Sequence, residues 1–178
     1  FCHCRSLMKI EIPSTITSIK RLTFKGCTSL EYVKIPSCVS SIESEAFFDC
    51  ENLKIINIPS LVTSIEDYSF AKCSMLTEIT LPSSLTSIGN NAFMECKSLK
   101  KIQIPSTVTS IGDNAFYKCK SLVEISIPPT VASIGKNVFS GCKSLPRNSI
   151  PESFINKSCL CKSDTSSDSY SDCDINSI

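Results

Sequence analysis

The chain has 178 residues, of which 42% are hydrophobic and 20% are charged, and its formal net charge is +1. This balance excludes a protein that binds nucleic acid or membrane surfaces through a broad basic field. The apolar residues never run for the roughly 18 positions that a membrane-spanning helix needs, and no window has the pattern of an export signal.

A strict 23-residue period organises the sequence from its first residue. Phenylalanine recurs at Phe1, Phe24, Phe47, Phe70, Phe93, Phe116 and Phe139. Cysteine recurs at Cys4, Cys27, Cys50, Cys73, Cys96, Cys119 and Cys142, and proline at Pro13, Pro36, Pro59, Pro82, Pro105, Pro128 and Pro151. Three residue types of different chemistry keep one register without insertion or deletion, which indicates a repeat architecture.

Each unit begins with a Phe-x-x-Cys turn and continues into a short strand. In the stretch Leu99-Lys-Lys-Ile-Gln-Ile104 the residues end in alternation, with Ile102 and Ile104 on one face, which predicts a half-buried strand. Pro105 then ends the strand, because proline has no N–H to donate to a neighbouring ladder.

The second half of each unit predicts a second strand segment and a turn. Val108 and Ile111 form an apolar pair that predicts a short strand on the opposite side of the coil. The segment 113–119 is too short for an independent helix and predicts a single helical turn that seats the next Phe and Cys inside. The position after the second strand is glycine in three units and Lys or Glu in three others, which argues against a turn that only glycine can form.

No unit can bury its own apolar face, so the units must stack. Coils at the strand spacing of about 4.8 Å would bury the Phe, Cys, Leu, Ile and Val positions as continuous internal ladders. The sequence therefore predicts a repeat solenoid with the polar positions as external stripes.

The pattern L-x-x-I-x-I, followed by proline, V-x-S-I and A-F-x-x-C, resembles the BspA-like subclass of leucine-rich repeats over residues 1 to about 151. The resemblance implies a right-handed solenoid with a short parallel strand per coil. It also implies a cell-surface or secreted protein of a host-associated bacterium or parasitic protist. Several members are regarded as adhesins for extracellular-matrix proteins or host cells, and the family shares no catalytic residues.

We expect two regions: a solenoid of seven units over 1–161 and a Ser/Asp-rich, disordered tail over 162–178. The seventh unit departs from the pattern at Pro146, Asn148, Phe154 and Lys157, which indicates a frayed or capping coil. Because the chain starts at Phe1 rather than Met, we expect it to be a piece of a longer protein with further coils or a cap upstream.

The seven in-register cysteines are interpreted as a buried column, since free cysteine packs as a small hydrophobe. Cysteine side chains that point the same way do not readily adopt the dihedral angle that a disulfide bond requires. Five further cysteines lie outside this column: Cys2, Cys38, Cys159, Cys161 and Cys173. The clusters at 2–4 and 159–161 each resemble half a zinc site, but they fall at opposite ends, about 30 Å apart at the strand spacing. We predict no metal and leave open whether the last three cysteines form a disulfide or stay free.

The sequence shows none of the residue combinations that form a catalytic site. His3 is the sole histidine, so no histidine-based triad can be built, and no glycine-rich phosphate loop is present. The carboxylates Glu43 and Glu45 are interpreted as solvated charges. We predict that the protein is not an enzyme, has no catalytic residues and needs no cofactor.

The remaining candidate is the outward face of the main strand, whose residues vary while the core does not. The candidate partner-binding residues are Lys9, Glu11, Tyr32, Lys34, Ile55, Asn57, Glu78, Thr80, Lys101, Gln103, Glu124 and Ser126. Tyr32 and Ile55 add an apolar element bordered by charges, which is typical of a small protein-binding hot spot. A merely solvated face stays open as the alternative.

Two functions follow as hypotheses. The first is a non-enzymatic recognition module of a surface or secreted protein that adheres to a host or extracellular-matrix protein through the strand face. The alternative is an intracellular, cytoplasmic scaffold of the same fold, favoured by cysteines that look reduced. Neither involves nucleic acid or membrane insertion of this segment, and end-to-end self-association stays open because solenoid ends expose strand edges.

Overall fold

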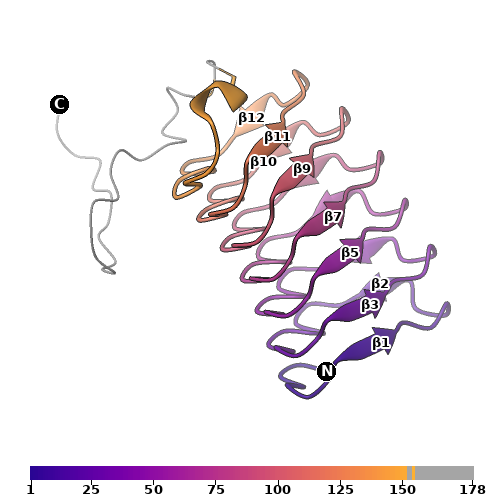
Figure 1. Ribbon diagram of the computed structural model, residues 1–178. Helices are drawn as coiled ribbons and strands as arrows, with labels where there is room; N and C mark the ends of the chain where they lie inside the picture. Colours follow the sequence, from indigo (N-terminus) through magenta and orange to yellow (C-terminus); the bar gives the residue numbers. More distant parts are fainter. Residues whose placement is uncertain (152–153, 155–178) are drawn as a thin grey trace.

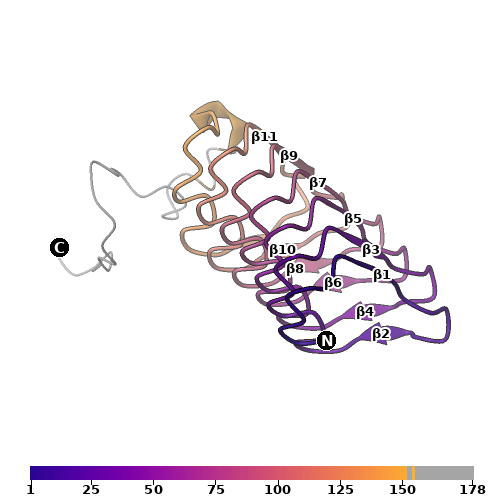
Figure 2. The same cartoon turned by 60° about the horizontal axis from the view of Figure 1, so that its bottom comes forward.

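The computed structural model describes residues 1–151 and 154, in which each 23-residue unit forms one coil of an elongated stack (Figure 1). The predicted solenoid is confirmed. Two ladders of short parallel strands run along the stack on different sides of the coils (Figure 2), so that the chain crosses from one side to the other within each unit.

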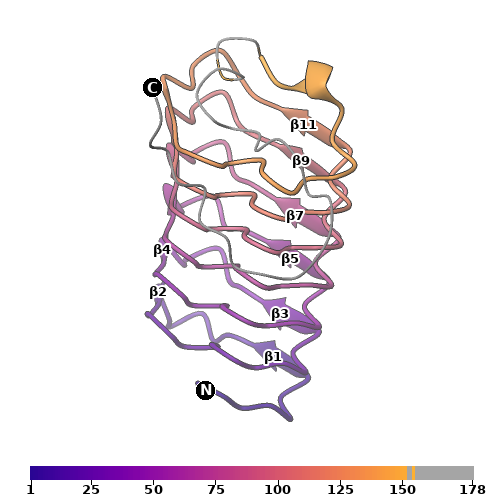
Figure 3. The ribbon, with the colours of Figure 1, turned by 90° about the vertical axis from the view of Figure 1, so that its left-hand side faces the viewer.

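The first ladder contains the three-residue strands predicted around each L-x-x-I-x-I core (Figure 3). It comprises β1 (Lys9–Glu11), β3 (Tyr32–Lys34), β5 (Ile55–Asn57), β7 (Glu78–Thr80), β9 (Lys101–Gln103) and β11 (Glu124–Ser126). The strands pair two by two in parallel, β1 with β3, β5 with β7 and β9 with β11, and equivalent residues lie opposite one another, as Ile10 with Val33 and Ile102 with Ile125. Each middle residue points inward and its neighbours point out, because successive side chains alternate across a strand.

The second ladder is built from two-residue strands with the sequence Ser-Ile. It comprises β2 (Ser18–Ile19), β4 (Ser41–Ile42), β6 (Ser64–Ile65), β8 (Ser87–Ile88), β10 (Ser110–Ile111) and β12 (Ser133–Ile134). Between the two ladders the chain turns at the conserved proline position of the repeat, where the Val108 N–H donates to the Pro105 carbonyl at 3.0 Å. The proline thus ends one strand and its carbonyl fixes the turn toward the next.

The core is a column of phenylalanine rings that runs through all seven units. Consecutive rings lie 5.1 to 5.8 Å apart between centroids, with planes within 15° of parallel. Centroids this far apart in nearly parallel rings mean an offset stack, which is the arrangement that the ring quadrupole favours. Phe47, Phe70, Phe93 and Phe116 are completely buried, whereas Phe1 is 62% exposed.

The segment that carries the phenylalanine is not helical, so the predicted helical turn is wrong. Asn114 and Lys118 adopt left-handed φ angles of 54° and 57°, which a right-handed helical turn cannot contain. The N–H groups of Asn114, Phe116 and Lys118 instead donate to carbonyls of the next coil, at Lys136, Val138 and Ser140. Asparagine at positions 91, 114 and 137 was the sequence signal for this left-handed backbone, because asparagine tolerates the left-handed region better than most residues.

Glycines 89, 112 and 135 follow the second strand in coils where an Asx side chain from the preceding coil approaches closely. The Asn90 side-chain oxygen accepts the Asp113 N–H at 2.8 Å, and Asp113 in turn accepts the Lys136 N–H at 2.7 Å. A Cβ on Gly112 would lie 2.6 Å from the Asn90 backbone nitrogen. Glycine is therefore required in these coils by space, although other coils carry Lys or Glu at the equivalent position.

The seventh unit differs from the others, as its departures from the pattern indicated. A 3₁₀ helix, η1 (Arg147–Ser149), stands where the earlier coils place the first strand, and Pro146 precedes it with extended backbone angles. Ile150 and Phe154 are still buried against the core. The boundary at residue 161, Lys157 and the tail over 162–178 lie outside the described residues.

Candidate binding surface

All twelve candidate residues lie exposed on the outward face of the first ladder. In each strand pair, a residue lies opposite its equivalent in the neighbouring coil. The candidate residues therefore form two parallel columns, one on the first and one on the last residue of each strand. Across six strands the columns extend over about 25 Å at the usual strand spacing. The residues therefore form a stripe rather than a convergent pocket, and we call this surface the strand face.

Charges on the strand face are paired across neighbouring coils. The Lys34 ammonium lies 3.2 Å from the Glu11 carboxylate, and Lys101 lies 2.6 Å from Glu124. All four side chains are more than half exposed, so each pair contributes little to stability. Among the described residues, Lys9 and Glu78 are the strand-face charges that have no ion-pair partner.

An apolar patch occupies the first three coils of the strand face. It consists of Met8, Tyr32 and Ile55, whose exposed fractions are 54%, 47% and 49%. The N–H of Tyr32 lies 3.4 Å from the Met8 carbonyl, and β3 lies beside β5, so the three side chains come from adjacent coils. A shallow hollow next to the patch is lined by Lys9, Ile10, Glu11 and Tyr32. Met8 was missed from the sequence because it precedes the strand, outside the alternating pair that defined the stripe.

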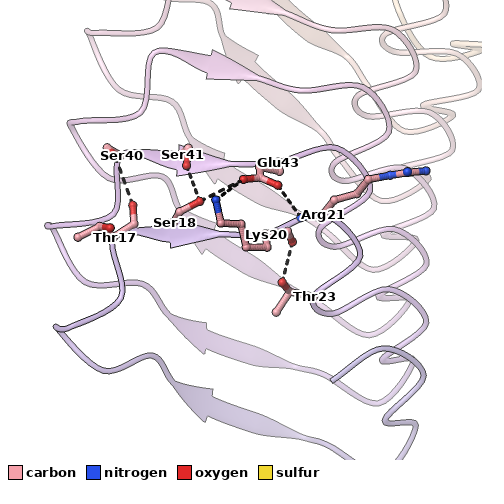
Figure 4. Close-up of polar contacts among 8 residues, drawn as sticks. All are labelled: Thr17, Ser18, Lys20, Arg21, Thr23, Ser40, Ser41 and Glu43. Atoms are coloured by element: carbon pink, nitrogen blue, oxygen red, sulfur yellow. Dashed lines mark hydrogen bonds and ion pairs between the residues drawn. The ribbon is translucent and has the colours of Figure 1, made fainter.

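A second polar cluster lies on the opposite side of the coils, beside the second ladder (Figure 4). The Glu43 carboxylate accepts hydrogen bonds from the Lys20 ammonium at 2.8 Å and the Arg21 N–H at 3.0 Å. Ser41 donates to Ser18 at 2.7 Å, and Ser18 lies 3.4 Å from Glu43. These contacts join the first coil to the second.

The carboxylates Glu43 and Glu45 have a structural role in this arrangement. The bond from Lys20 holds the pKa of Glu43 below its usual value, and the bond from Lys25, helped by Arg21, does the same for Glu45. A carboxylate with a lowered pKa is ionised at neutral pH and has no proton to donate, so neither group is arranged as a general acid. The interpretation of both as solvated charges is therefore incomplete, because Glu43 forms an ion pair with Lys20, and Glu45 forms ion pairs with Arg21 and Lys25.

Six members of the cysteine column, from Cys27 to Cys142, are buried free thiols, in agreement with its interpretation as a core ladder. The first member, Cys4, is exposed, so the interpretation is wrong for that residue. Each buried thiol donates to the phenylalanine carbonyl of the preceding coil, as Cys96 to Phe70 and Cys119 to Phe93, both at 3.1 Å. This second role was not predicted, and it explains why cysteine rather than alanine or valine fits the position. Burial raises the pKa of Cys50, Cys73, Cys96 and Cys119, so the nucleophilic thiolate is disfavoured.

The cysteines outside the column do not assemble a site in the described part of the chain. Cys2 is exposed, and the half-buried Cys38 thiol donates to the Ser14 carbonyl at 3.1 Å. Among the described residues, no group of three or more His, Cys, Asp or Glu side chains could hold a metal ion. Cys159, Cys161 and Cys173 lie outside the described residues.

The stacked parallel coils, their ladders of leucine, isoleucine and phenylalanine and their 23-residue period define a leucine-rich-repeat solenoid. A family model described as the BspA type leucine rich repeat region, in six copies, matches residues 1–121 and 86–178. The chain belongs to this BspA-type leucine-rich-repeat family. Repeat solenoids of this kind serve as protein-interaction modules.

Solved structures agree with this assignment. The leucine-rich-repeat protein TpLRR of T. pallidum is 33% identical with a TM-score of 0.81, and the match covers 89% of this chain and 73% of that one. A leucine-rich-repeat protein of Bacteroides ovatus ATCC 8483 is 39% identical with a TM-score of 0.75, and the match covers 78% of this chain and 38% of that one. A search of curated proteins found no match. Within the described residues, no helix is both long and apolar enough to cross a bilayer.

Proposed function

We propose that the solenoid is a non-enzymatic recognition module that binds a protein partner through the strand face. The observation that carries this proposal is the apolar patch of Met8, Tyr32 and Ile55, three large side chains about half exposed on adjacent coils. Large apolar side chains grouped at the surface and bordered by charges are the usual core of a protein-binding hot spot.

The electrostatics of the strand face suit this role. Glu11 already pairs with Lys34, and Glu31 with Lys54, so a partner that covers the patch meets few isolated charges. Lys9, opposite Tyr32, and Glu78, opposite Ile55, remain to pair with charges of the partner. These exposed pairs would form the polar rim of the interface, while Tyr32 supplies contact area at low entropic cost. The rim sets orientation and the patch supplies most of the affinity.

The partner class we propose is a host or extracellular-matrix protein, with the chain as part of a surface or secreted protein. Membership of the BspA-type family supports this proposal, since several members of that family are regarded as adhesins. The rigid stack also supports it, because an elongated surface of repeated strands can engage an extended partner over several coils.

Replacing the two central side chains of the patch tests the assignment. We expect Tyr32→Ala with Ile55→Ala to weaken binding to the best-bound protein of a purified extracellular-matrix panel by about 30-fold or more, the loss typical of a hot-spot pair. Binding is measured by biolayer interferometry with the full chain.

A matched variant on the same face provides the control. Thr80→Ala with Gln103→Ala removes two exposed polar side chains from β7 and β9, outside the patch, and is expected to leave the affinity within about threefold. If the Tyr32/Ile55 variant keeps its affinity while its circular dichroism is unchanged, the strand-face proposal is wrong.

The alternative is an intracellular scaffold, and one observation favours it: all nine cysteines in the described part of the chain are free. Most of these thiols are buried, however, and buried thiols escape oxidation in either compartment. Antibody labelling of intact source cells with serum raised against residues 1–161 separates the two. We expect surface signal without permeabilisation, whereas signal only after permeabilisation would favour the scaffold.

A further inference from the structure

At several equivalent positions, neighbouring coils carry charges of opposite sign. Five pairs join residues 23 or 24 positions apart, namely Lys20 with Glu43, Arg21 with Glu45, Lys34 with Glu11, Lys54 with Glu31, and Lys101 with Glu124. Such alternation is expected, because equivalent positions of neighbouring coils lie close together and like charges there repel.

Two sets of equivalent positions carry like charges instead, namely Glu43 with Glu66 and a column of three lysines. The tetrapeptide Cys-Lys-Ser-Leu occurs three times at the 23-residue interval, which stacks Lys97, Lys120 and Lys143 on the turn that precedes the first ladder. All three side chains are exposed. We call these three residues the lysine column.

The backbone holds the lysine column in register. The Ser121 N–H donates to the Lys97 carbonyl at 3.2 Å, which joins the two turns directly. The third turn is aligned by the Cys142 thiol, which donates to the Phe116 carbonyl at 3.1 Å, and by the ring of Phe139 stacked on that of Phe116. Three like charges are therefore fixed about one coil spacing apart, over about 10 Å along the solenoid.

The lysine column has few counter-charges within residues 1–151. Lys97 has the carboxylate of Glu95, in its own coil, at 3.7 Å, and Lys120 and Lys143 form no ion pair with any described residue. The surrounding coils reinforce the charge, since residues 93–151 contain eight Lys or Arg and three Asp or Glu, a local net charge of +5. The near-neutral total of the chain conceals this basic end.

We propose that the lysine column binds a linear sulfated polysaccharide, with the polymer lying along the solenoid axis. A row of ammonium groups at regular spacing matches a polymer that carries anionic groups at regular intervals. Each lysine is followed by a serine, at 98, 121 and 144, whose hydroxyl adds a donor for sulfate or carboxylate oxygens. This site lies on a turn edge rather than on the strand face, so it does not depend on the proposed protein partner.

The side chains around the lysine column favour a polysaccharide over nucleic acid. Single-stranded nucleic acid is bound by combining a positive groove with aromatic side chains on which the bases stack. The positions of the three Cys-Lys-Ser-Leu turns that reach the surface are the exposed lysines and the serines, of which Ser98 and Ser121 are half-buried, and none of them is aromatic. The nearby Tyr117 ring is contacted by the Lys118 ammonium at 5.1 Å from its centroid.

Binding of the full chain to a heparin dodecasaccharide tests the proposal, by titration calorimetry at about 0.15 M salt. We expect the variant Lys97→Gln, Lys120→Gln, Lys143→Gln to lose about 100-fold in affinity, at roughly fivefold per lysine. The matched control Lys9→Gln, Lys34→Gln, Lys54→Gln removes the same charge from the other end of the stack and should lose less than about threefold. Circular dichroism checks that both variants keep the fold.

Three results would overturn the proposal. Equal losses in the two variants would mean that heparin senses net charge rather than the lysine column. Failure of the unaltered chain to bind heparin would remove the site. Equally tight binding of an oligothymidine of the same charge, with the same dependence on the three lysines, would assign the column to nucleic acid instead.

Discussion

Replacing Phe93 by alanine is expected to lower the free energy of unfolding by about 3 to 5 kcal/mol, the usual cost of truncating a buried aromatic ring. Phe93 is completely buried and stacks on both sides, against Phe70 at 5.7 Å and Phe116 at 5.4 Å. Its loss opens a cavity that neighbouring coils cannot close, since their spacing is fixed by the strand ladders. Urea denaturation followed by circular dichroism gives the value.

Replacing Phe1, the first ring of the column, by alanine separates the effect of burial from the effect of ring stacking. Phe1 belongs to the same column and stacks on Phe24 at 5.5 Å, but it is 62% exposed and has one ring neighbour instead of two. Phe1→Ala should therefore cost only about 1 kcal/mol. Similar losses in the two variants would mean that burial does not set the cost of removing a ring from the column.

Replacing Gly112 by alanine is expected to cost about 2 to 3 kcal/mol, which is large for the addition of one methyl group. The new Cβ would lie 2.6 Å from the Asn90 nitrogen and 2.7 Å from both the Gly89 carbonyl carbon and the Asn90 side-chain oxygen, so backbone as well as a side chain has to move. Unfolding in urea, as for Phe93, measures the effect.

Two variants show whether backbone contact is the cause. Glu66 occupies the same place in its coil and already has a Cβ, so Glu66→Ala should change stability by less than about 0.5 kcal/mol. Adding Asn90→Ala to Gly112→Ala should not restore stability, because the Asn90 backbone nitrogen remains in place. Recovery in the double variant would instead assign the clash to the Asn90 side chain.

The two binding proposals use different sides of the same coil and different halves of the stack. The apolar patch lies in the first three coils of the strand face, whereas the lysine column lies on the turns of the last three coils. A protein partner and a sulfated polysaccharide could thus be bound together, as they occur together in extracellular matrix. The separation also means that the Tyr32/Ile55 variant leaves the lysine column intact, and that the Lys97/Lys120/Lys143 variant leaves the apolar patch intact.

The solenoid itself could be predicted from the sequence because its core depends on composition at fixed spacing. A unit with Phe, Cys, Leu and Ile at constant positions can bury them only by stacking, so the period alone determined the coil, the inward column of Phe93 and its equivalents, and the exposed stripe. The stripe followed from the two-residue alternation of a strand, which places Tyr32 and Ile55 outside whenever Val33 and Ile56 lie inside.

Contacts between coils were decided only by the tertiary structure, because they join residues about 23 positions apart whose approach depends on the backbone path. The turn at 113–119 is not helical because its N–H groups gain partners in the next coil, which no local propensity describes. For the same reason the close approach that requires Gly112, the thiol bond from Cys96 and the position of Met8 beside Tyr32 appeared only in the stacked molecule. The sequence by itself determined what each coil buries and exposes, and stacking decided which of those groups meet.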